Sequence, residues 1–511
     1  MPSPVKRSTA EASLASAAFL FLLGLYAAFG LCLNNAPMQD LPDHITRAHV
    51  IADLIFNRGG EFGNYFTLEP TFSPYIAGDL LLASLDRLTG TAWACRLSIA
   101  ASIVLLPLGV WFVVRKQGGG HVAASTAGVL ALYVATDSVF TLGFANFLFS
   151  AACTLFAYGW FCEAARAPSR YSYACFVLLL LLGYAMHLSS LVFLITIAGV
   201  SASLWVLKRQ LSVKRATALL LPALLLLVVQ AVLSPGVNLH SSYSWGTWLS
   251  KLSWFAFPAL RFKLTTDLAI LAMFAATAAF PIAVSWLRGA AAGAEQLLIA
   301  VALTLLYVMT PSAEGKTAYL DVRALHYAWL FVIGAGVASA ELRPRMQRAQ
   351  LAAASILGLV NLVYLAAWML PQNAALGEYR QLARGIPLNA NVLPIDTRAP
   401  LRGTRHHYYD PFRHAGAYAT LESHVVTPYL FAGDRQPHLS YFRYIDRPYA
   451  PYETWYSEPV RAEEAHVAWD RVRREYRYLL VTLPWDARKI PVSYTVVAQN
   501  DVAALLELTD R

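Results

Sequence analysis

Long runs of apolar residues alternate with short polar segments over the first 370 residues of the chain. A helix of about 20 residues crosses the hydrocarbon core of a bilayer, so runs of this length predict membrane spans. The apolar stretch 171–207 is too long for one span, and His187 to Ser190 supplies a turn inside it. The pattern predicts eleven spans, near residues 12–33, 92–114, 120–137, 145–165, 171–187, 189–207, 216–234, 266–287, 295–311, 324–341 and 349–370.

The basic residues of the short loops predict how these spans are oriented. If the N-terminus lies inside, in the cytoplasm, every inside loop carries Lys or Arg, as the positive-inside rule requires. The segment 34–91, the loops 235–265 and 312–323, and everything after residue 370 then lie outside. Short loops, Ala- and Leu-rich spans and a preference for Arg over Lys favour a bacterial inner membrane with a periplasmic C-terminal part. The inside residues are Arg115, Lys116, Arg166, Arg170, Lys208, Arg209, Lys214, Arg215, Arg288, Arg343, Arg345 and Arg348.

The composition becomes polar and aromatic after residue 370. Short apolar and alternating stretches there predict a small extracytoplasmic α/β domain over residues 371–511. Residues 1–370, with the first outer loop 34–91, would form the transmembrane module, an all-α bundle of about eleven helices. The elements expected in the C-terminal domain are a helix at 375–385, strands at 391–396, 476–483 and 494–499, and a helix at 501–509.

The overall composition excludes an ordinary soluble protein. Of the 511 residues, 57% are hydrophobic and 14% are charged, whereas soluble domains carry roughly a quarter charged residues. The net charge of +9 is compatible with nucleic-acid binding, but the basic residues lie in short clusters between apolar runs, as topology signals do. We therefore expect membrane lipids, and no nucleic acid, as partners. The five cysteines all lie at or before Cys175 and form no CxxC pair, which argues against a C-terminal disulfide framework and against a CxxC metal site.

The densest cluster of chemically reactive side chains follows the first apolar run, in the motif Asp40-Leu-Pro-Asp43-His44-Ile-Thr-Arg47. Pro42 suits the first turn of a helix, where its missing N–H is not needed. Counted from Asp40, the two carboxylates, the imidazole and the guanidinium fall at offsets of 0, 3, 4 and 7, which places them on one helix face. The pattern predicts a short amphipathic helix lying on the membrane surface.

Two interpretations of this helix remain open from the residues alone. An acidic pair at the mouth of a membrane span can act as a general base toward a hydroxyl, as a metal site or as a proton relay. Alternatively, the segment is a capped surface helix, with Asp40 near its N-terminus and Asp43 paired with Arg47 four residues later.

A second cluster lies at the outer end of the span 324–341, where Arg323 and His326 share a helix face. A guanidinium there can hold a phosphate through bidentate, charge-assisted hydrogen bonds. The alternative is that Arg323 snorkels to the interface beside Asp321. Lys316, in a Gly-Lys-Thr sequence, lacks the first glycine and the preceding strand of a P-loop, although it could meet a lipid phosphate.

Two further groups of residues carry weaker signals. Trp245 and Trp248 belong to an aromatic outer loop that is either an interfacial belt or a lid over a lipid or sugar site. The C-terminal part is rich in histidine, but no spacing typical of a metal site supports metal binding, so exposed polar loops are expected. These histidines are His406, His407, His414, His424 and His438.

The layout resembles the GT-C class of membrane glycosyltransferases, which use polyprenyl-phosphate-linked sugars. The similarity covers nearly the whole chain: one span leads into a long outer loop with an acidic motif and two juxtamembrane helices, a many-span bundle carries Arg323 at an outer mouth, and an outer α/β domain follows. The family's acidic residues are usually adjacent, whereas two residues separate Asp40 from Asp43. The sequence Pro42-Asp43-His44 is similar to a Pro-Asp-Glu form and favours Asp43 as the base, while closeness to the first span favours Asp40.

This resemblance implies transfer of a sugar from a polyprenyl phosphate to a lipid, glycan or protein acceptor on the outer face. Asp40 or Asp43 would take the proton of the acceptor hydroxyl, and Arg323 would stabilise the departing phosphate with Lys316 and His326. A divalent cation, Mg²⁺ or Mn²⁺, would fit if both carboxylates faced the phosphate, although some members of the class need none. The side chains expected to contact substrate are His44, Arg47, Glu69, Trp245 and Trp248.

Two other functions fit the sequence in part. A lipid or polysaccharide transporter or flippase would have ionisable residues spread through the bilayer midplane and internal repeats. The sequence has few mid-span charges and no evident repeat. A non-catalytic membrane assembly partner is the third interpretation, and the acidic motif argues against it.

Overall fold

The chain folds as two compact units in the computed structural model. Unit 1 consists of Met1–Gly30, Ala100–Phe140 and Asn146–Leu365, and unit 2 consists of Leu31–Ile99, Thr141–Ala145 and Ala366–Arg511. The structure describes residues 4–57, 60–69, 73–233, 243–245, 247–289, 292–314, 317–341, 343–388, 390–395, 410–430, 432, 441–446, 448, 468–483 and 493–509.

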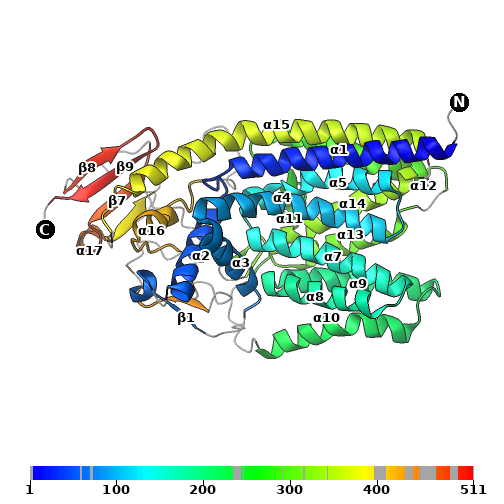
Figure 1. Cartoon of the computed structure of the whole chain (residues 1–511), viewed down its shortest axis with the longest axis horizontal. Helices are drawn as coiled ribbons and strands as arrows, with labels where there is room; N and C mark the ends of the chain where they lie inside the picture. Colours follow the sequence, from blue (N-terminus) through cyan, green and yellow to red (C-terminus); the bar gives the residue numbers. More distant parts are fainter. Residues whose placement is uncertain are drawn as a thin grey trace. The chain divides into compact units, whose positions relative to one another are not determined.

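Unit 1 is built of helices (Figure 1). Eight helices of the described chain have the length and apolar composition to cross a membrane, as expected for a multi-pass membrane protein. They are α1 (Pro4–Cys32), α4 (Thr91–Lys116), α7 (Ala145–Arg166), α9 (Ser189–Leu207), α10 (Val213–Leu233), α12 (Leu264–Trp286), α14 (Val322–Glu341) and α15 (Pro344–Ala383).

Three shorter apolar helices complete the set of predicted spans: α5 (His121–Ala135), α8 (Arg170–Met186) and α13 (Ala294–Met309). Each predicted span therefore coincides with a helix, and the predicted turn at His187 separates α8 from α9. That all eleven helices cross the membrane stays a prediction. The remaining elements of this part are α6 (Ser138–Thr141), α11 (Trp248–Trp254), η2 (Phe257–Ala259) and a small antiparallel sheet of β2 (Tyr243–Ser244), β3 (Ala313–Glu314) and β4 (Thr317–Ala318).

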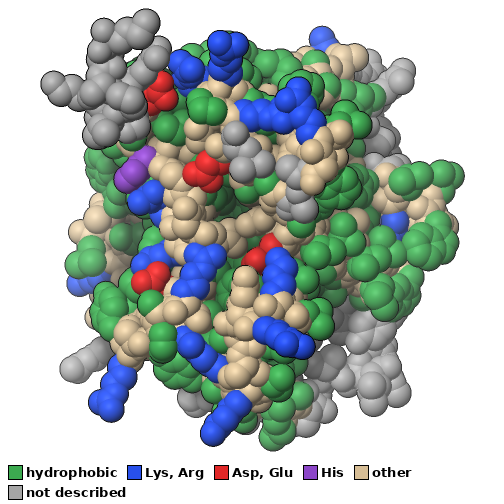
Figure 2. Space-filling model, turned by 90° about the vertical axis from the view of Figure 1, so that its right-hand side faces the viewer, with side chains coloured by type: hydrophobic (Ala, Val, Ile, Leu, Met, Phe, Trp, Pro, Cys, Tyr) green, Lys and Arg blue, Asp and Glu red, His purple; other side chains and the backbone are tan. Residues whose placement is uncertain are grey.

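Helix ends that carry the basic loop residues meet at one end of unit 1. The N–H of Gly120, before α5, donates to Oε1 of Glu341 at the end of α14 (2.6 Å). Arg166, at the end of α7, donates from Nη1 to the carbonyl of Lys116 at the end of α4 (2.7 Å). Figure 2 views the molecule from the side where the N-terminus lies in Figure 1, and Lys and Arg side chains predominate there over Asp and Glu. Basic charge gathered on one side is the pattern that the positive-inside rule requires, while the orientation itself stays a prediction.

A buried polar network joins helices of unit 1. Asn361 of α15 donates from Nδ2 to the Tyr26 hydroxyl of α1 (2.8 Å) and to Oγ1 of Thr136 (3.0 Å). Arg261 donates from Nη1 to Oδ1 of Asn361 (2.7 Å) and to the Thr136 carbonyl (3.0 Å). Polar groups inside an apolar bundle need partners, because no water is present to satisfy them. The network therefore fixes how α1 and α15 pack against the end of α5.

Unit 2 combines helices with two sheets. Helices α2 (Leu41–Phe56) and α3 (Ile76–Thr89) pack on each other, and strand β1 (Phe66–Leu68) pairs antiparallel with β6 (Phe442–Tyr444). A four-stranded sheet has the order β5-β7-β9-β8, in which β5 runs parallel to β7 and the other pairs are antiparallel. The strands are β5 (Val392–Ile395), β7 (Tyr478–Thr482), β8 (Tyr494–Gln499) and β9 (Ala503–Leu508), and the short helices are η1 (Phe62–Asn64), α16 (Ala417–Ser423) and α17 (Trp469–Glu475).

The predicted strands at 391–396, 476–483 and 494–499 are confirmed, but the predicted helix at 501–509 is wrong. That segment is strand β9, which lies in the sheet between β7 and β8. The side chain of Asn500 accepts hydrogen bonds from the N–H groups of Val502 and Ala503, and this turn reverses the chain between β8 and β9. Pairing on both edges overrides the helix propensity of the Ala- and Leu-rich sequence.

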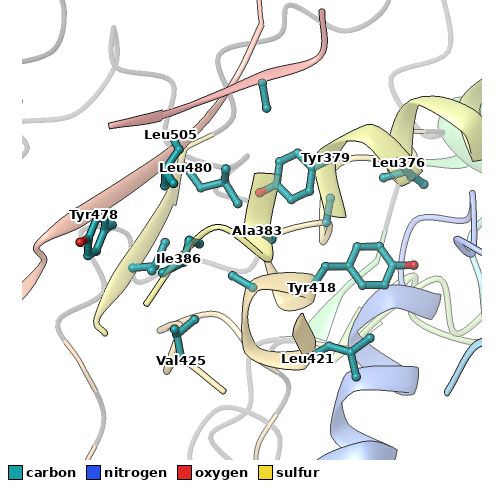
Figure 3. Close-up of a cluster of buried hydrophobic side chains, with 14 of the residues drawn as sticks. Leu376, Tyr379, Ala383, Ile386, Tyr418, Leu421, Val425, Tyr478, Leu480 and Leu505 are labelled. Atoms are coloured by element: carbon teal, nitrogen blue, oxygen red, sulfur yellow. The ribbon is translucent and has the colours of Figure 1, made fainter. Parts of the chain in front are cut away.

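One face of this sheet packs against the C-terminal part of α15 and against α16 (Figure 3). Tyr379 and Ala383 of α15 lie in the same buried cluster as Leu480 and Leu505 of the sheet. Tyr418 brings α16 into the cluster. The predicted helix 375–385 is thus the end of α15, and its apolar face forms a core with the sheet.

The structure groups the chain differently from the predicted division at residue 370. The segment Leu31–Ile99 belongs to the same unit as the C-terminal part. Thr46 of α2 donates to the carbonyl of Ala417 (3.3 Å), and the Tyr418 hydroxyl donates to the carbonyl of Asn35 (2.6 Å). These bonds and the pairing of β1 with β6 explain why the first outer segment folds with residues beyond 370.

Close packing of α14 on α12 yields a test of the bundle. A Cβ at Gly336 would lie 2.1 Å from the carbonyl oxygen of Ala278, a backbone atom that cannot swing away. We expect Gly336→Ala to destabilise the protein by about 1–3 kcal/mol, as overpacking does. Thermal unfolding in detergent measures the loss. Gly199→Ala is the matched control, because no described atom lies within 4 Å of the added methyl group, and equal loss in both variants would contradict the packing.

Candidate functional site

The acidic motif begins in a backbone turn that is held from outside α2. The N–H groups of Gln39 and Asp40 donate to the carbonyls of Thr141 and Leu142 (3.1 and 2.9 Å). Gly143 follows with φ +80°, and a Cβ there would lie 2.7 Å from the first backbone nitrogen of α2. A glycine is therefore required at this position, both for its conformation and for the close approach.

Helix α2 is mostly buried within unit 2 instead of exposed, while its predicted place at the membrane surface stays a prediction. Ten of its 16 residues are buried, Asp43 and Arg47 among them. Pro42 occupies the first turn as predicted, but in the described structure the Asp40 side chain makes no capping hydrogen bond. Helix α3 and the segment before α16 cover the polar face, because Arg47 and the two carboxylates find their charged partners there.

His414 lies between the two carboxylates of the motif. Its Nδ1 is 3.1 Å from Oδ2 of Asp43, and its Nε2 is 3.4 Å from Oδ1 of Asp40. The three side chains differ in exposure: 1% for Asp43, 13% for Asp40 and 17% for His414. The structure thus brings Asp40 and Asp43 together around one imidazole, and Asp40 is the more accessible carboxylate.

Burial raises the pKa of both carboxyl groups, because an ionised carboxylate loses its hydration there. The imidazole of His414 opposes this rise in pKa at both positions, and the nearby charge of Arg413 opposes it at Asp40. The charge of Asp43 acts in the other direction and favours a proton on Asp40. A carboxylate that binds a proton more readily than usual is suited to act as a general base near neutral pH.

Arg47 pairs with Asp79 of α3, so the expected Asp43–Arg47 pair is wrong. Its Nε and Nη2 donate to the two carboxylate oxygens of Asp79, each at 2.7 Å, and Nη2 also donates to Nδ1 of His44 (3.0 Å). The Tyr441 hydroxyl donates to the same carboxylate. Burial acts to raise the pKa of Asp79, but the guanidinium outweighs it and lowers that pKa. A bidentate pair on α3 leaves Asp43 facing His414 instead of Arg47.

The side chains of this site do not fit a bridging cation. Both nitrogens of His414 face carboxylate oxygens, so the ring occupies the space between Asp40 and Asp43. Among the residues that the structure describes, no group of three or more His, Cys, Asp or Glu side chains is arranged to hold a metal ion. The arrangement therefore offers Mg²⁺ or Mn²⁺ no set of open carboxylate ligands.

Arg323 and His326 belong to unit 1, where both are buried on α14. Arg323 donates from Nη1 to Nε2 of His187 (3.0 Å), and its guanidinium lies 5.7 Å from the ring centroid of Phe147. His326 donates from Nδ1 to Oδ2 of Asp137 (2.8 Å), and its ring meets Phe147 edge-on at 5.6 Å. The shared contact with Phe147 confirms that Arg323 and His326 lie on one helix face.

The alternative in which Arg323 snorkels beside Asp321 does not match the described structure. Asp321 pairs with Lys251 of α11 at 3.0 Å, and both side chains are buried. Arg323 is 6% exposed and points to His187. A buried guanidinium at the start of a span is more consistent with recognition inside the bundle than with an interfacial anchor.

Among the other predicted site residues, Glu69 lies in unit 2, Trp245 and Trp248 lie in unit 1, and Lys316 lies outside the described chain. Glu69 forms an exposed ion pair with Arg443 at 3.1 Å, and Trp245 and Trp248 are exposed. His424, expected in an exposed loop, is half-buried and pairs with Glu61. Lys316 and the histidines at 406, 407 and 438 lie outside the described residues.

Sequence reasoning missed the most informative residue, His414, which was expected in an exposed polar loop. It also missed Asp79 and Tyr441 around Arg47, and Asp137 and His187 around α14. The signal for Asp79 was an acidic side chain directly before the apolar run Leu80–Leu82, since a carboxylate among apolar residues needs a partner. His414 and Tyr441 had no local signal, because their partners are hundreds of positions away in the sequence.

The Arg47–Asp79 pair predicts a large stability difference between two arginine substitutions. Arg47→Met leaves the buried Asp79 carboxylate without its guanidinium, and we expect a loss of about 3–5 kcal/mol. Arg443→Met removes an exposed partner of Glu69, and we expect a loss of at most about 1 kcal/mol. Chemical unfolding of both variants in detergent measures the difference. Similar losses would show that the buried pair is not required for the fold.

The raised pKa of Asp43 predicts a stabilising substitution with a defined pH dependence. A raised pKa in the folded state means that ionisation above it costs the folded state more than the unfolded state. Asp43→Asn cannot ionise, so we expect it to unfold at a higher temperature than wild type at pH 7–8. The difference should vanish below about pH 4, where carboxyl groups are protonated in both states. Thermal melts across this range measure it, and a less stable variant at pH 8 would contradict the expected cost.

No family model matches the chain, and no curated protein matches it. A function must therefore be inferred from the side chains. Unit 2 contains a buried acidic pair around an imidazole, and unit 1 contains a buried Arg and a buried His on one face of α14.

Proposed function

We propose that this chain is an integral membrane glycosyltransferase. It would move a sugar from a polyprenyl-phosphate donor to a lipid, glycan or protein acceptor on the outer face of the membrane. The observation that carries the proposal is the buried Asp40–Asp43 pair, whose pKa values are raised, at the start of a helix in a multi-span chain. The resemblance of the motif and of the order of elements to the GT-C class supports the same function.

Asp40 is the base in this proposal. Its side chain is 13% exposed, against 1% for Asp43, so an acceptor hydroxyl can reach it. As the acceptor oxygen attacks the anomeric carbon, its proton passes to the Asp40 carboxylate. The bond between the anomeric carbon and the phosphate oxygen breaks, and its electron pair leaves with the lipid phosphate.

Arg323 and His326 would receive the charge of the leaving phosphate. A guanidinium offers fixed donors to phosphate oxygens, and burial strengthens such hydrogen bonds because water is excluded. Asp137 holds Nδ1 of His326, which leaves Nε2 for a ligand. Lys316 stays a candidate for the same phosphate. Trp248, which is exposed, stays a candidate for contact with the lipid or sugar.

The localisation follows from the same proposal. The N-terminus and the basic loops would face the cytoplasm, and the acidic motif and the C-terminal sheet would lie in the periplasm of a bacterial inner membrane. Donor and acceptor would both be presented at the outer face, where a membrane-bound lipid donor and the acceptor can meet.

A transporter or flippase for a lipid or polysaccharide is the second candidate function. The observation that favours it is two fully buried pairs of ionisable side chains in unit 1, Asp137 with His326 and Arg261 with Asp267. Ionisable groups inside an apolar bundle are typical of ion and substrate pathways. A transporter would move the lipid-linked sugar without releasing lipid phosphate.

Release of the lipid phosphate distinguishes the two functions. Purified full-length protein is incubated with a panel of labelled polyprenyl-phosphate sugars and acceptors, and free lipid phosphate is measured. We expect turnover by wild type, a loss of about 10²- to 10⁴-fold in Asp40→Asn, as for removal of a general base, and a large loss in Arg323→Met.

Asp470→Asn and Arg471→Gln are the matched controls, because both change exposed side chains of α17. We expect both to keep wild-type turnover. Donor binding without turnover in any protein, together with movement of the donor across vesicle membranes, would replace the transferase with the transporter. Unchanged turnover in Asp40→Asn would remove the acidic motif from the chemistry.

A further inference from the structure

His414 is held rigidly at the start of α16. Phe412 is buried in the core of unit 2, and its N–H donates to Oδ1 of Asp410 (2.9 Å). The carbonyl of His414 accepts from the N–H of Ala417 (3.1 Å), the first residue of α16. The residues that precede and follow His414 in the sequence are thus fixed by core packing and by turns. The fold therefore sets the position of the imidazole ring.

The two nitrogens of this imidazole have different surroundings. Nδ1 faces Asp43, which is 1% exposed, and Nε2 faces Asp40, which is 13% exposed. A buried carboxylate beside Nδ1 favours the tautomer with the proton on that nitrogen and stabilises the imidazolium if a second proton arrives. The ring then presents the lone pair of Nε2 to Asp40.

Two guanidinium groups near the carboxylates affect their protonation. Arg413 lies close enough to Asp40, and Arg47 close enough to Asp43, to favour their ionised forms. His44 is turned toward Arg47 and accepts its hydrogen bond. The two guanidinium groups always carry their charge, so within this set the proton can move only among the two carboxylates and the imidazoles.

The contact between His414 and Asp40 gives the proton a route. Once Asp40 has taken a proton, the carboxyl group must lose it before the next turnover, and Nε2 of His414 lies 3.4 Å from its Oδ1. His414 is in contact with Asp40 and is the most exposed of the three side chains, at 17%. The imidazole therefore connects the buried carboxylates to solvent.

We propose that His414 is a positioning residue that relays the proton from Asp40 to water, with Asp43 stabilising the imidazolium. The relay rests on the proposed transferase function. After sugar transfer, the proton on Oδ1 of Asp40 moves to Nε2 of His414, which leaves Asp40 ionised and His414 positively charged between two carboxylates. The imidazolium then gives one proton to water and returns to the neutral form, so charge and protons balance over each turnover.

Turnover of the full-length protein is measured from pH 5 to 9 for wild type, His414→Gln, His414→Asn and His414→Ala. For wild type we expect activity to fall as the pH is lowered, because an imidazolium cannot accept the proton. We expect His414→Gln and His414→Asn to lose about tenfold or more in kcat at pH 7.5, with donor KM unchanged, and to lose this acid limb.

His414→Ala tests proton transfer directly. Small diffusible bases of graded basicity, imidazole and its methylated forms, are added at constant pH. We expect them to restore turnover in proportion to concentration, with the stronger bases more effective. A residue that only holds the fold together would show no dependence on the basicity of the added compound.

His424→Gln is the matched control, because this second histidine of the C-terminal part pairs with Glu61 and not with the acidic motif. It should keep both the rate and the acid limb. Wild-type rates and an unchanged pH profile in all His414 variants would overturn the relay while leaving the transferase intact. Absence of turnover in wild type with every donor would overturn the transferase and the relay together.

Discussion

The bidentate pair between Arg47 and Asp79 is the interaction on which the acidic site depends. It satisfies a guanidinium and a carboxylate that are both buried, and it fastens α2 to α3 through two hydrogen bonds of 2.7 Å. With Arg47 bonded to Asp79, Asp43 pairs with His414 at 3.1 Å, while the nearby charge of Arg47 still favours the ionised form of Asp43. The pair therefore fixes Arg47 on the side of α3 and leaves the imidazole as the direct partner of Asp43.

In the bundle of unit 1, buried polar side chains also bind one another across helices. Asn361 links Tyr26 to Arg261, and Asp137 holds His326, so polar side chains within apolar helices meet defined partners. Such groups are expensive to bury and are kept where they fix an arrangement or serve a function. Hydrogen bonds and close contacts, more than apolar burial, therefore specify how these helices pack, because lipid tails are as apolar as the side chains.

The sequence was sufficient to predict the helices of the bundle and three strands of the C-terminal sheet, since long apolar runs and short β-rich stretches are local signals. It failed for β9, where pairing with β7 and β8 decides the conformation. It also found Asp40 and Asp43 but not His414, because spacing along one helix reveals neighbours only within that helix. His414 lies far from the motif in the sequence, and its contact with the two carboxylates is seen only in the folded structure.

Strand β1 finds its partner in β6, and Thr46 of α2 finds its partner 371 positions later in the sequence. A ribosome makes the acidic helix and α3 early, whereas His414 and β6 come from a much later part of the chain. The contact between the two carboxylates and the imidazole can therefore form only after the helices of the bundle have been made.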